Sequence, residues 1–267
     1  MQQERLFVEE ERPFSFSGER EIELGTLWQL GQHVLMCGDC TDAEDMKALM
    51  DGHCADCVLT DPPYGQNQEG VSGDEPENLN KVISVLEDLP IVNAVVTAFQ
   101  SPRTLMAWMN KAAEAGLQFE RMLWLYKKAQ MSFPWRGWLL KSEAILLFSK
   151  GEPHWNDVKP YHHDVYELPY VSKELPAGIG WHGSVKPLSV VTDLLNRTSR
   201  QGDIVLDPFG GSGTTLIAAE QIQRTCCMME IEPKNCEVII KRWEITTGQK
   251  AANIITAPPA RKGGERY

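Results

Sequence analysis

The tetrapeptide Asp61-Pro-Pro-Tyr64 brings together residue types that could recognise a flat aromatic amine. Asp61 offers carboxylate oxygens as hydrogen-bond acceptors, and the carbonyl of Pro62 offers another acceptor without a competing N–H. Pro63 stiffens the turn, and Tyr64 presents a ring on which a planar ligand could stack. The same residues would also suit a plain turn that ends a strand, so the tetrapeptide needs a partner motif before it indicates a function.

A second candidate motif is residues 205–215, with the sequence Val-Leu-Asp-Pro-Phe-Gly-Gly-Ser-Gly-Thr-Thr. This segment predicts a strand, a glycine-rich turn and the start of a helix, and its glycines let the backbone turn tightly and approach a ligand closely. Glu230 lies 17 residues after Gly213, near the end of the next predicted strand. An acidic side chain at that place can hold both hydroxyls of a ribose.

The chemistry of this second motif favours S-adenosylmethionine as its ligand. The segment lacks the Gly-Lys-Ser/Thr sequence of a phosphate-binding loop, and Asp207 would repel a pyrophosphate. The same carboxylate would attract a ligand that carries an ammonium group. An ordinary strand-to-helix turn and the nucleotide site of a nicotinamide dehydrogenase are the alternatives.

Strands and helices alternate along most of the chain, which predicts an α/β fold with a doubly wound, mostly parallel sheet. The seven expected strands are residues 33–37, 56–60, 91–99, 121–126, 144–148, 204–206 and 225–230. The expected helices are residues 41–51, 79–89, 101–116, 187–198, 213–223 and 233–248. A capping box, Thr41-Asp-Ala-Glu44, is expected to begin the first helix, with Gly52 at its end. Ligands of such sheets bind beyond the carboxyl ends of the strands, where both motifs lie.

These segments together resemble the amino-group DNA methyltransferases over about residues 25–248. The matching residues are Gly38-Asp39, Asp61-Pro-Pro-Tyr64, Lys186-Pro187 and the glycine-rich segment at 207–215. The tetrapeptide precedes the glycine-rich segment by about 145 residues, which is the permuted motif order of the beta class. Residues 27–65 are particularly similar to phage-type and orphan adenine methylases.

The resemblance implies a Rossmann-like, S-adenosylmethionine-dependent methyltransferase fold with a seven-stranded sheet. It also implies methyl transfer to the N6 amine of an adenine in double-stranded DNA. Asp rather than Ser before Pro-Pro-Tyr favours adenine in this family, and the N4 amine of cytosine is the alternative. A homodimer is favoured by the resemblance. A restriction nuclease partner and an orphan enzyme are both compatible with the sequence.

The resemblance further implies roles for the matching residues. Asp61 and the Pro62 carbonyl would accept hydrogen bonds from the target amine, and Tyr64 would stack on the flipped base. Asp207 would face the methionine end of the cofactor, whereas Glu230 would bind its ribose. The remaining cofactor-binding residues would be Asp39 at the adenine, with Cys40, Lys186, Phe209, Gly211, Ser212, Gly213 and Thr214. One departure is His182-Gly-Ser-Val-Lys-Pro187, where the family often has His-Pro-Thr-x-Lys-Pro.

The expected mechanism follows from the chemistry of an exocyclic amine. The lone pair of adenine N6 is delocalised into the ring, and two acceptors on its hydrogens would localise and orient that pair. A sulfonium methyl group is a strong electrophile, so positioning and electrostatics can supply most of the catalysis. The chain has no Pro-Cys pair such as a cytosine-C5 enzyme needs for its thiolate. The target base must leave the duplex, because its amine is engaged in pairing.

The formal charge of −11 is unfavourable for DNA, but it is unevenly distributed. Residues 121–150 hold six Lys or Arg against one Glu, whereas residues 1–24 and 65–92 are strongly acidic. Lys127, Lys128 and Arg136 follow a predicted strand and are the expected DNA-binding residues, at the same sheet edge as the tetrapeptide. A solvated charged surface is the alternative interpretation.

The spacing of four cysteines would also suit a zinc ribbon, which is the rival, non-enzymatic interpretation of the chain. Cys37-Gly-Asp-Cys40 and Cys54-Ala-Asp-Cys57 form two CxxC pairs. A predicted helix separates the pairs, and a buried strand begins at the last cysteine, so we expect core thiols and no metal. His154, His162, His163 and Asp164 lie in a polar, irregular segment, and we expect them to be solvated or to face DNA.

The expected domain organisation is one methyltransferase domain with short additions. Residues 1–24 form an acidic arm, residues 25–256 the catalytic domain and residues 257–267 a loose tail. Residues 151–182 form a small insertion for target recognition, to which the polar loop at 65–78 could add. No apolar run is long enough for a membrane span, and the acidic N-terminus is unlike a signal peptide. We therefore expect a cytoplasmic protein of bacterial or phage origin whose cysteines are reduced.

Overall fold

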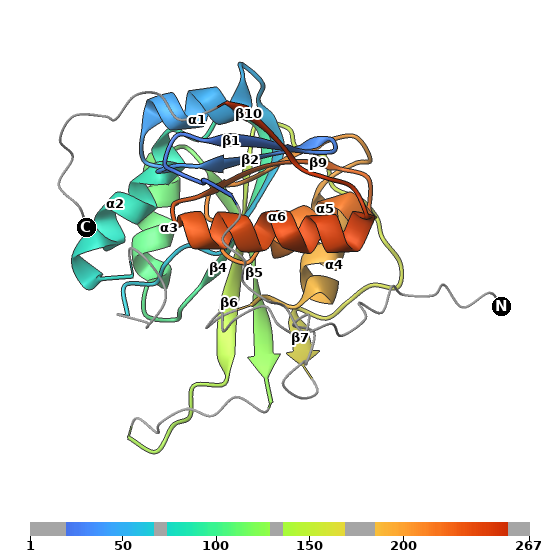
Figure 1. Cartoon of the computed structure of the whole chain (residues 1–267). Helices are drawn as coiled ribbons and strands as arrows, with labels where there is room; N and C mark the ends of the chain where they lie inside the picture. The colour runs from blue at the N-terminus through green and yellow to red at the C-terminus, as the bar shows by residue number, and fades with distance from the viewer. Residues whose placement is uncertain (1–19, 67–73, 129–135, 169–184, 256–267) are drawn as a thin grey trace.

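A ten-stranded sheet forms the centre of the computed structural model, which describes residues 20–66, 74–128, 136–168 and 185–255 (Figure 1). Its strands lie in the order β10-β1-β2-β9-β8-β3-β4-β6-β5-β7. β1 and β6 run opposite to the other strands. The strands are β1 (Leu27–Leu30), β2 (His33–Cys37), β3 (Ala55–Thr60), β4 (Ile91–Gln100), β5 (Gln118–Lys127), β6 (Ser142–Lys150), β7 (Val165–Leu168), β8 (Ile204–Asp207), β9 (Thr225–Glu230) and β10 (Ala252–Ile255). The prediction of a mostly parallel α/β sheet is confirmed.

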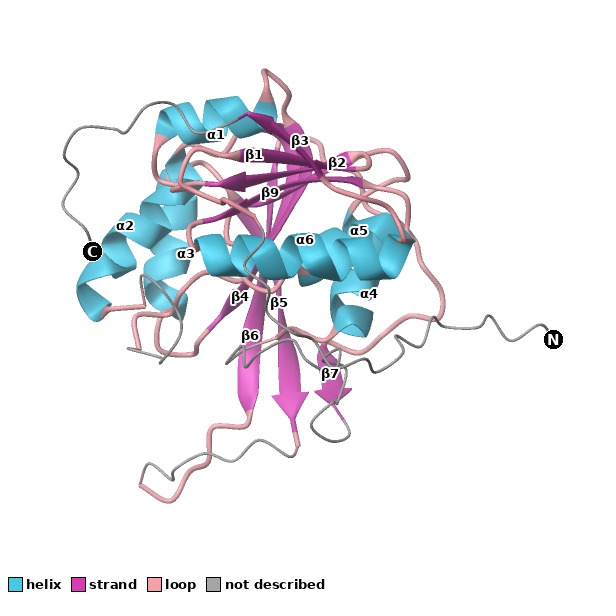
Figure 2. Cartoon of the chain, in the orientation of Figure 1, coloured by secondary structure: helices cyan, strands magenta, loops and turns pink. Residues whose placement is uncertain are grey.

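Helices cover both faces of the sheet, as a doubly wound fold requires (Figure 2). One face packs against α1 (Ala43–Met50), α2 (Leu79–Ser84) and α3 (Leu105–Glu114), with short 3₁₀ turns at Pro76–Asn78 and Val85–Glu87. The other face packs against α4 (Leu188–Thr198), α5 (Thr214–Gln221) and α6 (Pro233–Thr247). None of the helices in the described ranges is both long and apolar enough to cross a membrane.

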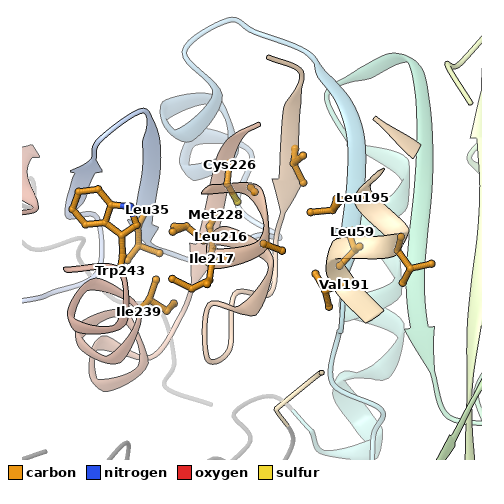
Figure 3. Packing of buried hydrophobic residues seen from close by; sticks show 14 of the residues in the cluster. Leu35, Leu59, Val191, Leu195, Leu216, Ile217, Cys226, Met228, Ile239 and Trp243 are labelled. Atoms are coloured by element: carbon orange, nitrogen blue, oxygen red, sulfur yellow. The ribbon is translucent and has the colours of Figure 1, made fainter. Parts of the chain in front are cut away.

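Alternating side chains of each strand divide the core into two layers, because successive residues of a strand point to opposite faces. In β9, Cys226 and Met228 pack towards α4, α5 and α6, whereas Cys227 and Met229 pack towards α1, α2 and α3. Figure 3 shows the first layer, where Met228 lies among side chains of α5 and α6 beside Trp243. Both layers hold the parallel strands rigidly, and their carboxyl ends therefore form a fixed edge.

The prediction of seven strands is wrong, because the sheet has ten. The additional strands β1, β7 and β10 have four residues each and lie at or near the two edges of the sheet. β7 falls inside the segment that was expected to be irregular, and it pairs in parallel with β5. A strand of four residues carries too little alternation to be distinguished from a loop unless a motif marks its end, as the glycine-rich turn does for β8.

The start of α1 also differs from the prediction. Asp42, not Thr41, caps the helix, and its side chain accepts a hydrogen bond from the Glu44 N–H at 2.9 Å. The Thr41 hydroxyl donates instead to Asp39 Oδ1 at 2.7 Å. The helix ends at Asp51 in the left-handed conformation, one residue before the expected Gly52. The capping box is therefore replaced by a turn that holds Asp39.

Parts of the expected additions to the domain lie outside the described residues. This applies to residues 1–19 of the acidic arm, residues 169–182 of the insertion and the tail at 257–267. The last residues of the arm are described, and Arg20 donates to both carboxylate oxygens of Glu244 on α6 at 2.9 Å. That part of the arm is therefore attached to the surface of the domain.

Candidate active site

The two sequence motifs meet at the carboxyl edge of the sheet. β3 and β8 are hydrogen-bonded neighbours, with Cys57 opposite Val205 and Val58 opposite Leu206. The tetrapeptide that follows β3 therefore lies beside the glycine-rich turn that follows β8, although about 145 residues separate them in sequence. The negative charge of Asp61 is near enough to act on Asp207.

A buried carboxylate holds the tetrapeptide in its turn. Asp74 Oδ1 accepts hydrogen bonds from the backbone N–H groups of Tyr64, at 2.6 Å, and Gly65, at 2.7 Å. The hydroxyl of Tyr64 donates to Asp61 Oδ1 at 2.7 Å. Sequence analysis missed Asp74, because nothing in the polar loop distinguishes it from the acidic residues that follow. Asp74 therefore anchors the site.

The Lys186 ammonium binds the second oxygen of Asp61. Its Nζ lies 2.5 Å from Asp61 Oδ2 and 3.4 Å from Glu143 Oε2, and its side chain is 5% exposed. Glu143 on β6 also pairs through Oε1 with Lys127 at the end of β5. We call this row of alternating charges, Asp61, Lys186, Glu143 and Lys127, the ionic row. Lys186, expected in the cofactor pocket, thus contacts the proposed catalytic carboxylate.

In the ionic row, burial disfavours the charged form of each side chain, whereas ion pairing favours it. Burial opposes the charge on Lys186, but Asp61 and Glu143 outweigh it and raise the pKa of the ammonium. Burial likewise opposes the charge on Glu143, and the two lysines outweigh it and lower its pKa. For Lys127 burial prevails and lowers the pKa. Burial and the nearby carboxylates raise the pKa of Tyr64, whose hydroxyl therefore stays protonated.

The glycine-rich turn wraps around two buried acidic side chains. Asp207 Oδ1 accepts from the Phe209 N–H at 3.1 Å, and Glu230 Oε2 accepts from the Gly211 N–H at 2.7 Å. Gly213 begins α5 with φ 81°, and a Cβ there would lie 3.0 Å from Ile239. Glycine is therefore required at this position on both backbone and packing grounds.

Asp207 and Glu230 fit the polar groups of S-adenosylmethionine. Burial raises the pKa of each carboxyl group to about 7, and within the described ranges neither forms an ion pair with Lys or Arg. A ligand ammonium would supply the missing positive charge at Asp207. Ribose hydroxyls could donate to Glu230, which already accepts from the Glu232 N–H at 2.9 Å. The donor set therefore suits this cofactor.

Arg242 supports the glycine-rich turn from α6. Its NH1 group donates to the Ser212 carbonyl at 3.0 Å and to Thr214 Oγ1 at 3.1 Å, and the side chain is buried. Ser212 and Thr214, both expected to bind cofactor, are thus fixed by a residue that sequence analysis did not select. An arginine on an amphipathic helix gives no signal of this role, since most arginines are exposed.

Asp39 and Cys40 follow β2. This strand pairs in parallel with β9, and its last residue, Cys37, lies opposite Glu230. Asp39 Oδ1 accepts from both the N–H and the hydroxyl of Thr41, and Oδ2 lies 3.0 Å from Lys81 Nζ. Burial would raise the pKa of Asp39, but these partners lower it. Burial raises the pKa of the Cys40 thiol. The structure thus places these two residues at the same edge as the glycine-rich turn.

The three expected DNA-binding residues have different environments. Lys127 is partly buried and paired with Glu143, so Glu143 already balances its charge. Lys128 and Arg136 are exposed, and the Lys128 carbonyl accepts from Lys141 Nζ at 3.1 Å. β5 is parallel to β4, since both pair antiparallel with β6, so its end lies at the same edge as Asp61.

The cysteines and histidines show no metal-binding arrangement in the part of the chain that the structure describes. No group of three or more His, Cys, Asp or Glu side chains is placed there to hold an ion. Cys37 and Cys57 are buried in the core, whereas Cys54 is exposed. His162 is exposed and stacks on Tyr166 with ring centroids 6.1 Å apart.

Comparison with known proteins identifies related sequences. The model of the N6/N4 methyltransferase family, described as DNA methylase, matches residues 55–242. YubD of Escherichia coli (strain K12), named as a methylase, is 27% identical over 211 residues that cover 73% of this chain and 82% of YubD. The DNA adenine methyltransferase YhdJ of the same strain is 21% identical over 249 residues, covering 78% of this chain and 82% of YhdJ.

Solved structures show the same fold. The complex of M1.HpyAVI with S-adenosylmethionine has a TM-score of 0.60 and 23% identity, over 78% of this chain and 98% of that one. The PvuII DNA methyltransferase, described as cytosine-N4-specific, has a TM-score of 0.61 and 16% identity, over 81% of this chain and 93% of that one. Since the family model spans most of this chain and includes both motifs, the protein belongs to the DNA methylase family of N6/N4 methyltransferases.

Proposed function

We propose that this protein transfers a methyl group from S-adenosylmethionine to the N6 amine of an adenine in double-stranded DNA. The observation that carries the proposal is the placement of Asp61 and Tyr64 beside two buried carboxylates, Asp207 and Glu230, at one sheet edge. Membership of the DNA methylase family supports the reaction class. The permuted order of the motifs supports membership of the beta class.

The cofactor occupies the turn after β8, with its methionine end towards Asp207 and its ribose at Glu230. S-adenosylmethionine supplies a methyl group activated by a positively charged sulfur. Asp207 attracts the ammonium group, and the backbone at Gly211 and Gly213 approaches the ligand without side chains in the way. Phe209, which is partly buried, forms a wall of the pocket.

The target base binds at the tetrapeptide after leaving the duplex. Asp61 and the Pro62 carbonyl accept hydrogen bonds from the exocyclic amine, which localises its lone pair towards the methyl group. Tyr64 stacks on the base. No covalent bond to the protein is needed, so the rate depends on positioning and on the charges around the amine.

The choice of adenine rests on Asp61 at the first position of the tetrapeptide. Cytosine-N4 methylation is the second candidate, because a cytosine-N4-specific enzyme shares this fold. The two are distinguished by incubating the protein with S-adenosylmethionine and unmethylated genomic DNA, and analysing the nucleosides by mass spectrometry. N6-methyladenine is the expected product. N4-methylcytosine would replace the proposal with its alternative, and no methylated base would overturn both.

DNA binds across the carboxyl edge of the sheet, with exposed Lys128 and Arg136 contacting phosphates. Lys127 lies nearest the site, and it contributes to methyl transfer as a member of the ionic row, through its ion pair with Glu143. Residues 151–168, which include β7 beside β5, extend this surface as part of the target-recognition segment. A homodimer would enlarge the surface further.

A further inference from the structure

The ionic row links four elements that sequence places far apart. Asp61 follows β3, Lys186 precedes α4, Glu143 lies on β6 and Lys127 ends β5. The row contains two negative and two positive charges, so it is balanced without any ligand. Glu143 and its two lysine partners are largely buried, which strengthens each interaction in the row.

Both oxygens of Asp61 have partners within the protein. Oδ1 accepts from the Tyr64 hydroxyl, and Oδ2 binds Lys186 at 2.5 Å. A hydrogen bond between ions is stronger than one from a neutral amine. The Lys186 ammonium therefore competes with the target base for the carboxylate that the base requires.

Glu143 provides a second place for the same ammonium. Its Oε2 atom is buried, accepts no hydrogen bond within the described residues and lies 3.4 Å from Lys186 Nζ. This separation exceeds the usual 2.7–2.9 Å or so of a charge-assisted hydrogen bond. A small movement of Lys186 would form the bond, and it would satisfy an acceptor that is otherwise costly to bury.

We propose that Glu143 is a positioning residue for methyl transfer: it draws Lys186 away from Asp61 Oδ2 when the amine of the target base binds there. The inference deepens the proposed function and depends on the role of Asp61 given above. Lys127 keeps the other oxygen of Glu143 occupied, so Glu143 presents Oε2 to Lys186 in a fixed orientation.

The kinetic test replaces Glu143 by glutamine, which keeps its shape and removes its charge. Lys186 then has Asp61 as its strongest partner and stays there, so kcat should fall by about tenfold or more while KM for DNA and cofactor changes little. The matched control is Glu120→Gln on β5. Glu120 is not part of the ionic row, and its carboxylate accepts a hydrogen bond from the Ser149 hydroxyl at 2.5 Å. This control should retain the parent kcat.

A second measurement follows Lys186 itself and needs no activity. In protein labelled at lysine, the Cε chemical shift of Lys186 is followed against pH, with Lys186→Arg used for assignment. The charged groups facing Lys186 are Asp61, Glu143 and Lys127, with the Tyr64 ring and hydroxyl beside them. Removing the charge of Glu143 should lower the pKa of Lys186 by about one unit or more. The Glu120→Gln control should leave it unchanged.

The outcomes separate this inference from the proposed function. Glu143→Asp keeps the charge and should recover part of the kcat lost in Glu143→Gln, whereas equal loss in both variants would overturn the inference. Parent values of kcat and of the Lys186 pKa in Glu143→Gln would also overturn it. An unmodified protein that methylates no DNA would instead contradict the proposed function, and the titration would still report whether Glu143 governs Lys186.

Discussion

Three carboxylates at the sheet edge have different partners, which prepares them for different groups. Asp61 is already bound by Tyr64 and Lys186, so it can exchange one partner for a neutral amine. Asp207 and Glu230 are buried without a cation among the described residues, and burial raises the pKa of both to about 7. Perturbed carboxylates of this kind are frequent at functional sites, because a ligand completes them.

Replacing Asp61 by asparagine should abolish most methyl transfer. The amide keeps the size of the side chain but loses the charge that polarises the amine, and its NH₂ group repels the amine hydrogens. We expect kcat to fall by at least about 100-fold, comparable with the loss of one stabilising group in other active sites. Single-turnover transfer of a labelled methyl group to unmethylated genomic DNA measures this. Calorimetry should show unchanged cofactor affinity, and near-parent turnover would remove Asp61 from its assigned role.

Cofactor affinity should depend on pH through Asp207. Its carboxyl group must lose a proton to bind an ammonium group, and its pKa in the free protein is about 7. The association constant for S-adenosylmethionine should therefore rise by up to about tenfold per unit between pH 5.5 and 7, then level off. Calorimetry across this range tests the slope. Asp207→Asn should bind weakly and with a smaller slope, because only Glu230 still titrates in this range, and affinity independent of pH in the parent would contradict the assignment.

The residues that sequence analysis missed share one property: their role exists only in the folded chain. Asp74, Arg242 and Glu143 act on groups more than five residues away, and no local pattern marks them. The tetrapeptide and the glycines were predictable because turn geometry and ligand chemistry restrict those residue types locally. Supporting side chains are restricted only by the neighbours that the fold brings to them.

At the scale of elements, the strands that could be predicted are those with continuous apolar runs. β4, buried on both faces along most of its length, was expected at 91–99 and spans Ile91–Gln100. β1, β7 and β10 were missed because each has four residues and no motif beside it. β8 is equally short, but the glycine-rich turn after it marks its end. The sheet edge that carries the site was predictable since both motifs directly follow central parallel strands.

The start of α5 should tolerate no side chain at Gly213. Gly213→Ala introduces a left-handed alanine, which costs about 1–2 kcal/mol, and a Cβ placed 3.0 Å from Ile239. Urea unfolding should show a loss larger than that of the control Gly202→Ala, where φ is 86° and no atom lies within 4 Å of the added Cβ. Cofactor affinity should fall only for Gly213→Ala. Equal effects of the two variants would show that packing against Ile239 contributes nothing.

At the scale of the whole molecule, exposed cations lie at one end of the sheet, close to the site. The end formed by β5, β6 and β7 extends beyond the helices, at the bottom of the view in Figure 2. Lys128 and Arg136 follow β5 at that end, and both are exposed. A protein with a net charge of −11 can approach DNA with such a surface, because phosphate contacts act over a short range at physiological salt.

The salt dependence of DNA binding should report these contacts. Each phosphate contact releases condensed counterions and contributes about 0.9 to the slope of log affinity against log salt. Replacing Lys128 and Arg136 together by alanine should therefore make the slope less negative by nearly two units and weaken binding to all sequences alike. Binding isotherms at several salt concentrations, on unmethylated genomic fragments and on scrambled duplexes, measure both effects.

Two controls assign the effect to the exposed charges. Lys47→Ala on α1 removes an exposed cation whose nearest partner, Glu44, is 4.0 Å away, and it should leave the slope unchanged. Lys127→Ala removes a charge that Glu143 already balances, so it should change the slope less than Lys128→Ala while lowering turnover through the ionic row. If the double variant keeps the parent slope, the DNA path does not cross the end of β5. If it changes the preferred sequence, these side chains contact base edges instead, since phosphates carry no base identity.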